Sequence, residues 1–267
     1  GVVECPLKHT DVQASISGFI ARVKVTQTFV NPSNEPIEAV YVFPLSHTGA
    51  VDDMTMVIGD RRIVGVIKRR AEARAMYEAA LRQGYTASLL EQERPNIFTQ
   101  SVGNIKPRQQ VKIEISYLDV LEYDMGIYEF HFPMVVGPRY NPGAPFAGTP
   151  APAANGLGAN GAMPAEGVNP PVLKPGFRNG HDISLSLTME AGVPVQDLKV
   201  VNHKATVKRK SVTAVDVEMD PADSVPNKDF VLRYAVAGEQ PAMALLPYSE
   251  SGNGGYFMLM IQPALDK

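Results

Sequence analysis

The feature that most constrains this fold is a two-residue alternation of apolar and polar side chains. It is strict at residues 111–117 and recurs at residues 128–132 and 183–189. Successive side chains of a strand point to opposite faces, so this period is typical of strands with one buried face. Less regular strands are predicted at residues 19–29, 38–43, 54–67 with a turn at 59–60, 97–102, 212–219, 230–236 and 256–261. Short strands at this spacing predict a mainly β fold of antiparallel sandwiches.

Residues 68–83 break this pattern and are predicted to form the one substantial helix. Ala73, Met76, Tyr77, Ala80 and Leu81 recur at helical spacing, and a glycine follows at position 84, where helices commonly end. The opposite face is basic and includes Arg69, Arg70 and Arg74. These arginines are candidate contacts for an acidic partner. The alternative is a solvated helix face that only keeps the domain soluble.

Proline and glycine divide the chain. Sixteen of the 44 Pro and Gly residues fall in residues 141–180, which predicts a linker or a long surface loop. The sequence therefore suggests one β domain at residues 1–140 and a second strand-rich, sandwich-like domain at 181–267. The alternative is one continuous sandwich that carries 141–180 as a long loop.

Composition excludes several classes of protein. With 25 basic and 28 acidic residues the net charge is −3, which disfavours nucleic acid as a partner. No apolar run approaches the ~18 residues of a membrane helix. The single cysteine, Cys5, excludes an internal disulfide and leaves the compartment open. Because the chain begins at Gly1 and not at Met, we expect it to be part of a longer protein.

No catalytic motif accompanies this pattern. Elements such as G-x-S-x-G, H-E-x-x-H and a phosphate-binding glycine loop do not occur. Asp52 and Asp53 follow His47 and are interpreted as a solvated turn, not as a cation site. No two histidines stand at the i, i+4 spacing of a helical metal pair, so each is expected to be a strand or loop residue: His9, His47, His131, His181 and His203.

One segment imitates a metal motif. Asp182, Ser184 and Ser186 spell the D-x-S-x-S with which adhesion-type A domains hold Mg²⁺. In a strand, however, the first and last of these residues lie about 13 Å apart, so they cannot converge on one ion. We interpret them as the wet face of a strand and expect no metal or cofactor in this chain.

Five sequence segments resemble the vault and inter-alpha-trypsin (VIT) domain family. They are YVFPL at 41–45, IGDRRIVGVIK at 58–68, the A-x-x-x-Y-E-A-A helix, GYTASLLEQERPNIFTQSVGNIKP at 84–107, and FPMVVGPRYNPG at 132–143. The resemblance implies a β-sandwich with one packed helix. Two positions depart from it: Arg108 follows Pro107 where glycine is usual, and Lys68, Arg69 and Arg70 are basic where acidic residues are usual. Both departures are expected at the surface.

The resemblance also implies a function. In this family the domain usually precedes a von Willebrand factor type A domain, whose metal site would lie beyond Lys267, and no catalytic residue is assigned to the VIT domain. We therefore expect a non-catalytic scaffold that presents the A domain to proteins, matrix or envelope components, in a secreted or cell-envelope protein. The alternatives are an enzyme whose site is assembled from residues scattered in the sequence, and a cytoplasmic location.

Overall fold

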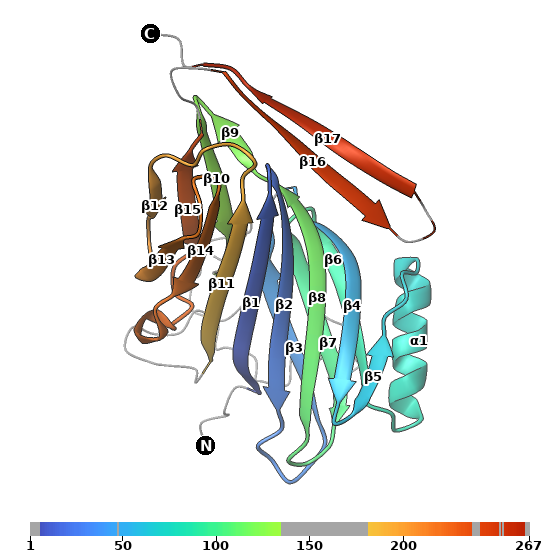
Figure 1. The fold of residues 1–267 in the computed structure, drawn as a ribbon. Helices are drawn as coiled ribbons and strands as arrows, with labels where there is room; N and C mark the ends of the chain where they lie inside the picture. The colour runs from blue at the N-terminus through green and yellow to red at the C-terminus, as the bar shows by residue number, and fades with distance from the viewer. Residues whose placement is uncertain are drawn as a thin grey trace, which may run out of the picture.

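The structure is a computed structural model that describes residues 6–46, 48–134, 181–236, 241–250, 252 and 254–264. Figure 1 shows a large sheet with smaller sheets behind it, a helix at the side and a hairpin above. The strands are β1 (Leu7–Ser17), β2 (Ile20–Val30), β3 (Ile37–Pro44), β4 (Ala50–Ile58), β5 (Arg61–Val64), β6 (Ala87–Arg94), β7 (Ile97–Ile105), β8 (Gln110–Val120), β9 (Glu122–Asp124), β10 (Ile127–Phe132), β11 (Asp182–Glu190), β12 (Leu198–Val200), β13 (Ala205–Arg209), β14 (Ala214–Met219), β15 (Phe230–Ala235), β16 (Ala242–Glu250) and β17 (Gly254–Gln262). The helix is α1 (Arg70–Arg82), and Pro221–Asp223 form a single 3-10 turn.

Four sheets organise these strands. The largest has the order β13-β14-β11-β1-β2-β8-β4-β5. A three-stranded sheet, β3-β7-β6, and a four-stranded sheet, β12-β15-β10-β9, contribute to the same hydrophobic core, and β16 and β17 pair with each other. The prediction of a mainly β fold with one helix is confirmed.

Strand β8 illustrates why the alternation was informative. Val111, Ile113, Ile115 and Tyr117 are at most 1% exposed, whereas the residues between them lie on the outer face of the large sheet. The strand pairs with β2 on one side and β4 on the other. Burial of one face on the core fixes the register, because a one-residue shift would expose every apolar side chain.

One pairing departs from the antiparallel prediction. Strands β1 and β11 run parallel, with His9 opposite Asp182 and Ser17 opposite Glu190. A parallel pair needs a long crossover instead of a tight turn, and here all of β2 to β10 lies between the two partners in the sequence. No local pattern announces such a pairing.

The two halves of the chain share their sheets. Besides the β1–β11 pair, β10 pairs with β15 through Ile127 to Phe132, so strands from both sides of residues 141–180 form continuous ladders. Segment 141–180 itself lies outside the described residues. The ladders favour one continuous sandwich over domains bounded at residues 140 and 181, and the two-domain division stays a prediction.

Helix α1 ends as the sequence suggests. Gly84 has a φ of +78°, and the amides of Gly84 and Tyr85 donate to the carbonyls of Leu81 and Ala80. The helix lies against β6 and β7, and Gly103 permits its close approach: a Cβ at Gly103 would lie 2.5 Å from a methyl group of Leu81. Among the helix residues, only Tyr77 is buried.

Hairpin β16–β17 rests on one end of the sandwich. Its Ala244 and Met260 are buried, and Gln262 donates to the hydroxyl of Tyr123 on β9. Two glycines with positive φ, Gly18 and Gly192, face the hairpin at this contact. The contact is therefore built from small residues on the sandwich and aliphatic ones on the hairpin.

Candidate interaction surface

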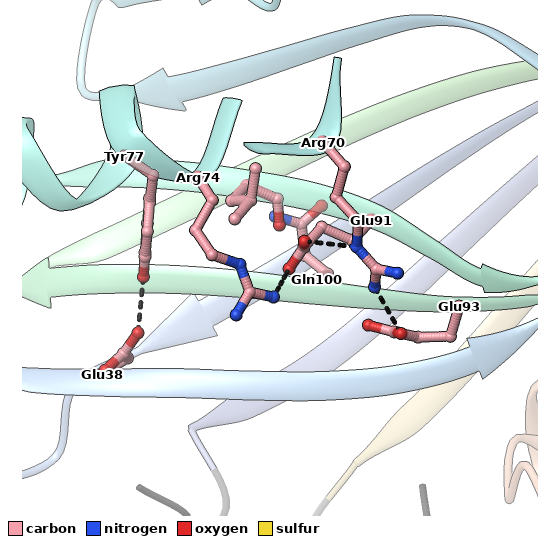
Figure 2. A network of polar contacts seen from close by, with 8 residues as sticks. Glu38, Arg70, Arg74, Tyr77, Glu91, Glu93 and Gln100 are labelled. Atoms are coloured by element: carbon pink, nitrogen blue, oxygen red, sulfur yellow. Dashed lines mark hydrogen bonds and ion pairs between the residues drawn. The ribbon is translucent and has the colours of Figure 1, made fainter. Parts of the chain in front are cut away.

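The basic helix face predicted to bind a partner lies over a row of carboxylates. Figure 2 shows Arg70 and Arg74 extending from α1 toward Glu91 and Glu93 of β6. The Arg70 Nε donates to Glu91 over 3.0 Å, and its Nη2 donates to Glu93. The Arg74 Nη2 donates to the second oxygen of Glu91 over 2.6 Å. Both oxygens of Glu91 are thus occupied.

Burial makes Glu91 the centre of this network. Its side chain is 5% exposed, whereas Arg70 and Arg74 are 52% and 39% exposed. The hydrogen bonds that Arg70 donates to Glu93 and then to Glu91 raise the pKa of Arg70, because they favour its positive charge. A carboxylate this buried needs paired cations to offset its lost hydration. The arginines supply that pairing while keeping much of their surface in water.

A second contact fastens the middle of the helix. The Tyr77 hydroxyl donates to Glu38 of β3 over 2.6 Å (Figure 2). Burial, and then the hydrogen bond to this carboxylate, raise the pKa of Tyr77 well above its ordinary range. The phenol therefore stays protonated and acts as a donor. Helix α1 is consequently tied to two strands of the three-stranded sheet.

The spacing of the partners explains the match. Residues four apart on a helix are displaced by about 6 Å along its axis, and residues two apart on a strand by about 6.6 Å. Arg70 and Arg74 therefore fall alongside Glu91 and Glu93. Arg69 lies just before the helix, where its carbonyl accepts from the Ala73 amide. A partner-binding role for these arginines stays a prediction, and the ion pairs give two of them a structural one.

The sequence predicted that the acidic pair at positions 52 and 53 forms a turn, and this prediction is wrong. Both residues lie in β4, where the register with β8 shifts between Val51 and Asp53. The shift exposes both carboxylates, and Asp52 accepts from both terminal nitrogens of Arg22, at 2.8 and 2.9 Å. A cross-strand arginine thus holds the first carboxylate. The other residue of this hypothesis, His47, lies outside the described residues.

The parallel β1–β11 pair assembles polar residues that the sequence keeps apart. His9 Nδ1 lies 2.6 Å from Asp182 Oδ1, and His9 Nε2 lies 3.1 Å from Ser184 Oγ. The Ser184 hydroxyl also donates to Asp11 over 2.6 Å. The prediction that Asp182, Ser184 and Ser186 lie on a strand is confirmed by β11.

This order of serine, histidine and aspartate invites comparison with a nucleophilic triad. A triad needs the serine proton to be taken by the imidazole. Here the one hydroxyl proton of Ser184 is donated to Asp11 and is not directed at His9. Ser184 also sits within a regular strand, not on a sharp turn that would present it to a substrate. The geometry therefore suits a set of hydrogen bonds that joins strands β1 and β11.

The remaining histidines that the structure describes make hydrogen bonds that hold parts of the fold together. His131 on β10 contacts Asp229, and the buried His203 contacts Asp223 and the carbonyl of Lys228. His181 shares a 2.8 Å hydrogen bond with Thr10, and burial lowers its pKa to about 4. Cys5 lies outside the described residues.

Within the described ranges, no three His, Cys, Asp or Glu side chains gather in a way that would hold a metal ion. Across the same part of the chain, no helix has the length and apolar character needed to cross a membrane.

Comparison with known proteins places the first half of the chain. Residues 7–117 match the family model of the vault protein inter-alpha-trypsin domain. Protein mono-ADP-ribosyltransferase PARP4 of Mus musculus is 41% identical over 50% of this chain and 7% of its own length. Von Willebrand factor A domain-containing protein 5A of Rattus norvegicus is 34% identical over 51% and 17%. Inter-alpha-trypsin inhibitor heavy chain H4 of Homo sapiens is 31% identical over 44% and 13%.

The chain thus spans less than a fifth of each of these relatives. Among solved structures, aminopeptidase A of Legionella pneumophila has a TM-score of 0.40 at 10% identity, covering 98% of this chain and 24% of that one, a likeness too low to carry an argument. The sequence match begins with β1 and ends within β8, and it includes α1 and its carboxylate partners. Residues 7–117 are therefore a vault protein inter-alpha-trypsin domain.

Proposed function

We propose that this chain is a non-catalytic interaction module that presents or orients a von Willebrand factor type A domain of the same polypeptide for adhesion or assembly. The observation that carries the proposal is the family match over residues 7–117 together with a relative named for its A domain. This chain and that relative are 34% identical over 138 residues, which makes a shared domain architecture the simplest expectation.

The polar contacts support a scaffold role. Glu91 is paired with two arginines of α1, and the Ser184 hydroxyl, which lies beside His9 and Asp182 in a triad-like order, donates to Asp11. A catalytic base or nucleophile must keep a proton site open for substrate. In these two clusters the sites are filled by other residues of the chain, so they fix strand and helix positions.

The proposal includes partners and location. The partners are proteins, beginning with the chain's own A domain and extending to matrix or envelope components. We place the protein outside the cytoplasm, in the secreted or cell-envelope fraction. The coding sequence upstream of Gly1 tests this: an export signal there supports the location, and a further cytosolic domain contradicts it.

Adhesion of the full-length protein tests the function. Full-length protein and a variant without residues 7–264 are compared for binding to immobilised matrix or envelope preparations, with circular dichroism to verify that the remaining domain is folded. We expect the deletion to abolish binding. Equal binding by the deletion variant would contradict the scaffold role.

A point variant separates the enzyme alternative. In the full-length protein, Ser184→Ala should leave binding unchanged, because the hydroxyl only joins two strands. Loss of function with an unchanged melting temperature would instead favour an enzyme assembled around His9 and Asp182.

A further inference from the structure

Hairpin β16–β17 has two faces of different character. Residues of one face turn toward the sandwich: a Cβ built on Gly192 would lie 2.6 Å from Ala244, and one on Gly18 would lie 2.5 Å from Leu246 and 3.5 Å from Met258. Ala244 pairs with Met260 and Leu246 with Met258 across the ladder. At Ala244 and Met260 the inner face is therefore covered by the rest of the chain, whereas Tyr248 and Tyr256, which pair farther along the same face, are 62% and 71% exposed.

The outer face consists of the alternate residues and is apolar along most of its length. Its successive cross-strand pairs are Met243 with Ile261, Leu245 with Leu259, and Pro247 with Phe257. These side chains carry no charge. Their exposed fractions are 71% for Met243, 61% for Ile261, 60% for Leu245, 54% for Leu259 and 72% for Phe257.

Figure 1 shows the hairpin at the top of the molecule, extending past the strands of the large sheet. Near its turn, the two strands border an open hollow of about 510 Å³ whose lining includes Leu245, Tyr248, Tyr256 and Phe257. Of these residues Leu245 and Phe257 belong to the outer face, and a phenylalanine is a large anchor of the kind that dominates protein interfaces. A patch of this composition is the ordinary mark of an interaction site.

The size of the patch indicates what covers it. A nine-residue strand is about 30 Å long, and a two-stranded ribbon with its side chains is roughly 10 to 20 Å wide, which gives about 300 to 600 Å². A standard interface takes about 800 Å² from each partner. A free partner or a second copy of the chain would therefore bind weakly here. A domain tethered to the same polypeptide needs less area, because a short linker raises its effective concentration to about the millimolar range.

We propose that the outer face of hairpin β16–β17 is the docking surface for the A-type domain of the same polypeptide, which Met243, Leu245, Phe257, Leu259 and Ile261 contact directly. This rests on the proposed function, in which such a domain is present. The hairpin thereby connects the two domains rigidly. Its inner face is fixed to the sandwich at Gly18 and Gly192, and its outer face sets the orientation of the A domain.

Side-chain oxidation tests the docking. Hydroxyl radicals are applied to the full-length protein and to the 1–267 chain, and mass spectrometry measures oxidation of Met243. Met76 on α1, 49% exposed, serves as the internal control. Methionine oxidation follows exposure, so we expect Met243 to react roughly fivefold more slowly in the full-length protein while Met76 is unchanged.

Two exposed substitutions in the full-length protein make the test specific. Leu259→Glu, on the outer face, should restore Met243 oxidation to the rate in the 1–267 chain. Val64→Glu on β5, a position 68% exposed, should leave Met243 protected. Because both side chains are exposed, neither change should unfold the sandwich, and the rate at Met76 verifies this.

Other outcomes overturn the proposal. Equal oxidation of Met243 in the two proteins means that the A domain does not cover the hairpin. Protection in the 1–267 chain that grows with its concentration means that a second copy covers it. If the full-length sequence contains no A-type domain, the proposed function fails as well, whereas an A domain that leaves Met243 exposed refutes only the docking.

Discussion

Thr10 and His181 share a 2.8 Å hydrogen bond inside the sandwich although 171 positions separate them in the sequence. Thr10 is 5% exposed and His181 4%. The bond lies at the start of the parallel β1–β11 pair, where Thr10 is opposite Ile183. It therefore joins the VIT domain to the part of the chain that follows residue 180.

The shared ladders predict that the described sandwich unfolds as one unit. A thermal melt followed by circular dichroism and by calorimetry should give one transition with matching enthalpies. Residues 1–140 alone should not fold stably, because they would lose β11 from the edge of β1 and β15 from the edge of β10. Two separate transitions, with a folded 1–140 fragment, would instead support the division at residues 140 and 181.

Cleavage provides an independent measurement of the same question. A protease site placed in segment 141–180 should yield two pieces that elute together in gel filtration and separate only in denaturant. Pieces that separate in native buffer would contradict a shared core.

His181 should make the sandwich acid-sensitive. Burial chiefly lowers its pKa from 6.5 to about 4, with Asp182 opposing and His9 adding to the shift. Below pH 6.5 the unfolded chain therefore binds a proton that the folded chain refuses, so stability falls as the pH decreases toward 4. Between pH 7 and pH 5 this one group should cost about 2 kcal/mol.

The measurement is urea unfolding of the native chain and of His181→Asn at pH 7 and pH 5. The variant loses stability at both pH values but should lack this part of the pH dependence. If the free energy of unfolding changed equally between pH 7 and pH 5 in the two proteins, His181 would be protonated at pH 5 in the folded state as well.

Glu91 should contribute more to stability than the exposed ion pair between Glu72 of the same helix and Lys68, which precedes it. In Glu91→Gln the two arginines lose their charged partner, but they are exposed enough to recover hydration, so we expect a loss of about 1–3 kcal/mol. Glu72→Gln, which breaks the exposed pair with Lys68, should change stability by less than about 0.5 kcal/mol. Denaturant unfolding compares the two variants, and equal effects would show that the buried network is not what holds α1.

The sequence pattern was sufficient to predict the strands with one buried face and the helix. It was insufficient to predict contacts between residues that are distant in the sequence. β6 was not among the predicted strands, so the sequence offered no contact between Glu91 or Glu93 and the helix. For the arginines it offered only a docking face or a solvated helix face. Glu91 and Glu93 are two positions apart, and they follow Arg70 and Arg74, which are four positions apart. This spacing was a usable signal for the contact between the helix and the strand.

Long-range pairing left no such signal. The β1 strand carries threonine and alanine on its inner face, at Thr10 and Ala14, and this weakens the apolar alternation. Its parallel partner follows only after residue 181, so neither strand predicts the other. The β16 strand was not among the predicted strands, and it includes Pro247, a residue that weakens a strand pattern and is typical of strand edges.

Arg108 is held in a conformation that favours glycine. Its φ is +61°, at the position where the family resemblance led us to expect glycine. The left-handed region costs a residue with a side chain about 1–2 kcal/mol, part of which glycine returns through its freer unfolded state. Arg108→Gly should therefore be more stable than Arg108→Ala by about 0.5–1 kcal/mol.

The alanine variant is the matched control, because both changes remove the 3.2 Å hydrogen bond from Arg108 to Asn34. Thermal melts of the two variants measure the backbone effect alone. An alanine variant as stable as the glycine variant would mean that this turn relaxes to a negative φ.

The last prediction concerns the seat of the hairpin. Gly18 and Gly59 have nearly the same φ, +61° and +57°, but a Cβ at Gly18 would lie 2.5 Å from Leu246, and nothing lies within 4 Å of one at Gly59. Gly59→Ala therefore reports only the cost of the positive φ, about 1–2 kcal/mol. Gly18→Ala carries the same cost and in addition forces Leu246, or the hairpin that carries it, to move. In the 1–267 chain we expect Met260, which is 5% exposed, to become oxidised by hydroxyl radicals in Gly18→Ala but not in Gly59→Ala.

If Met260 stayed protected in both variants, the hairpin would be held by contacts other than its fit against Gly18. Its fixed position on the sandwich would then have to rest on Gly192 and on the bond between Gln262 and Tyr123.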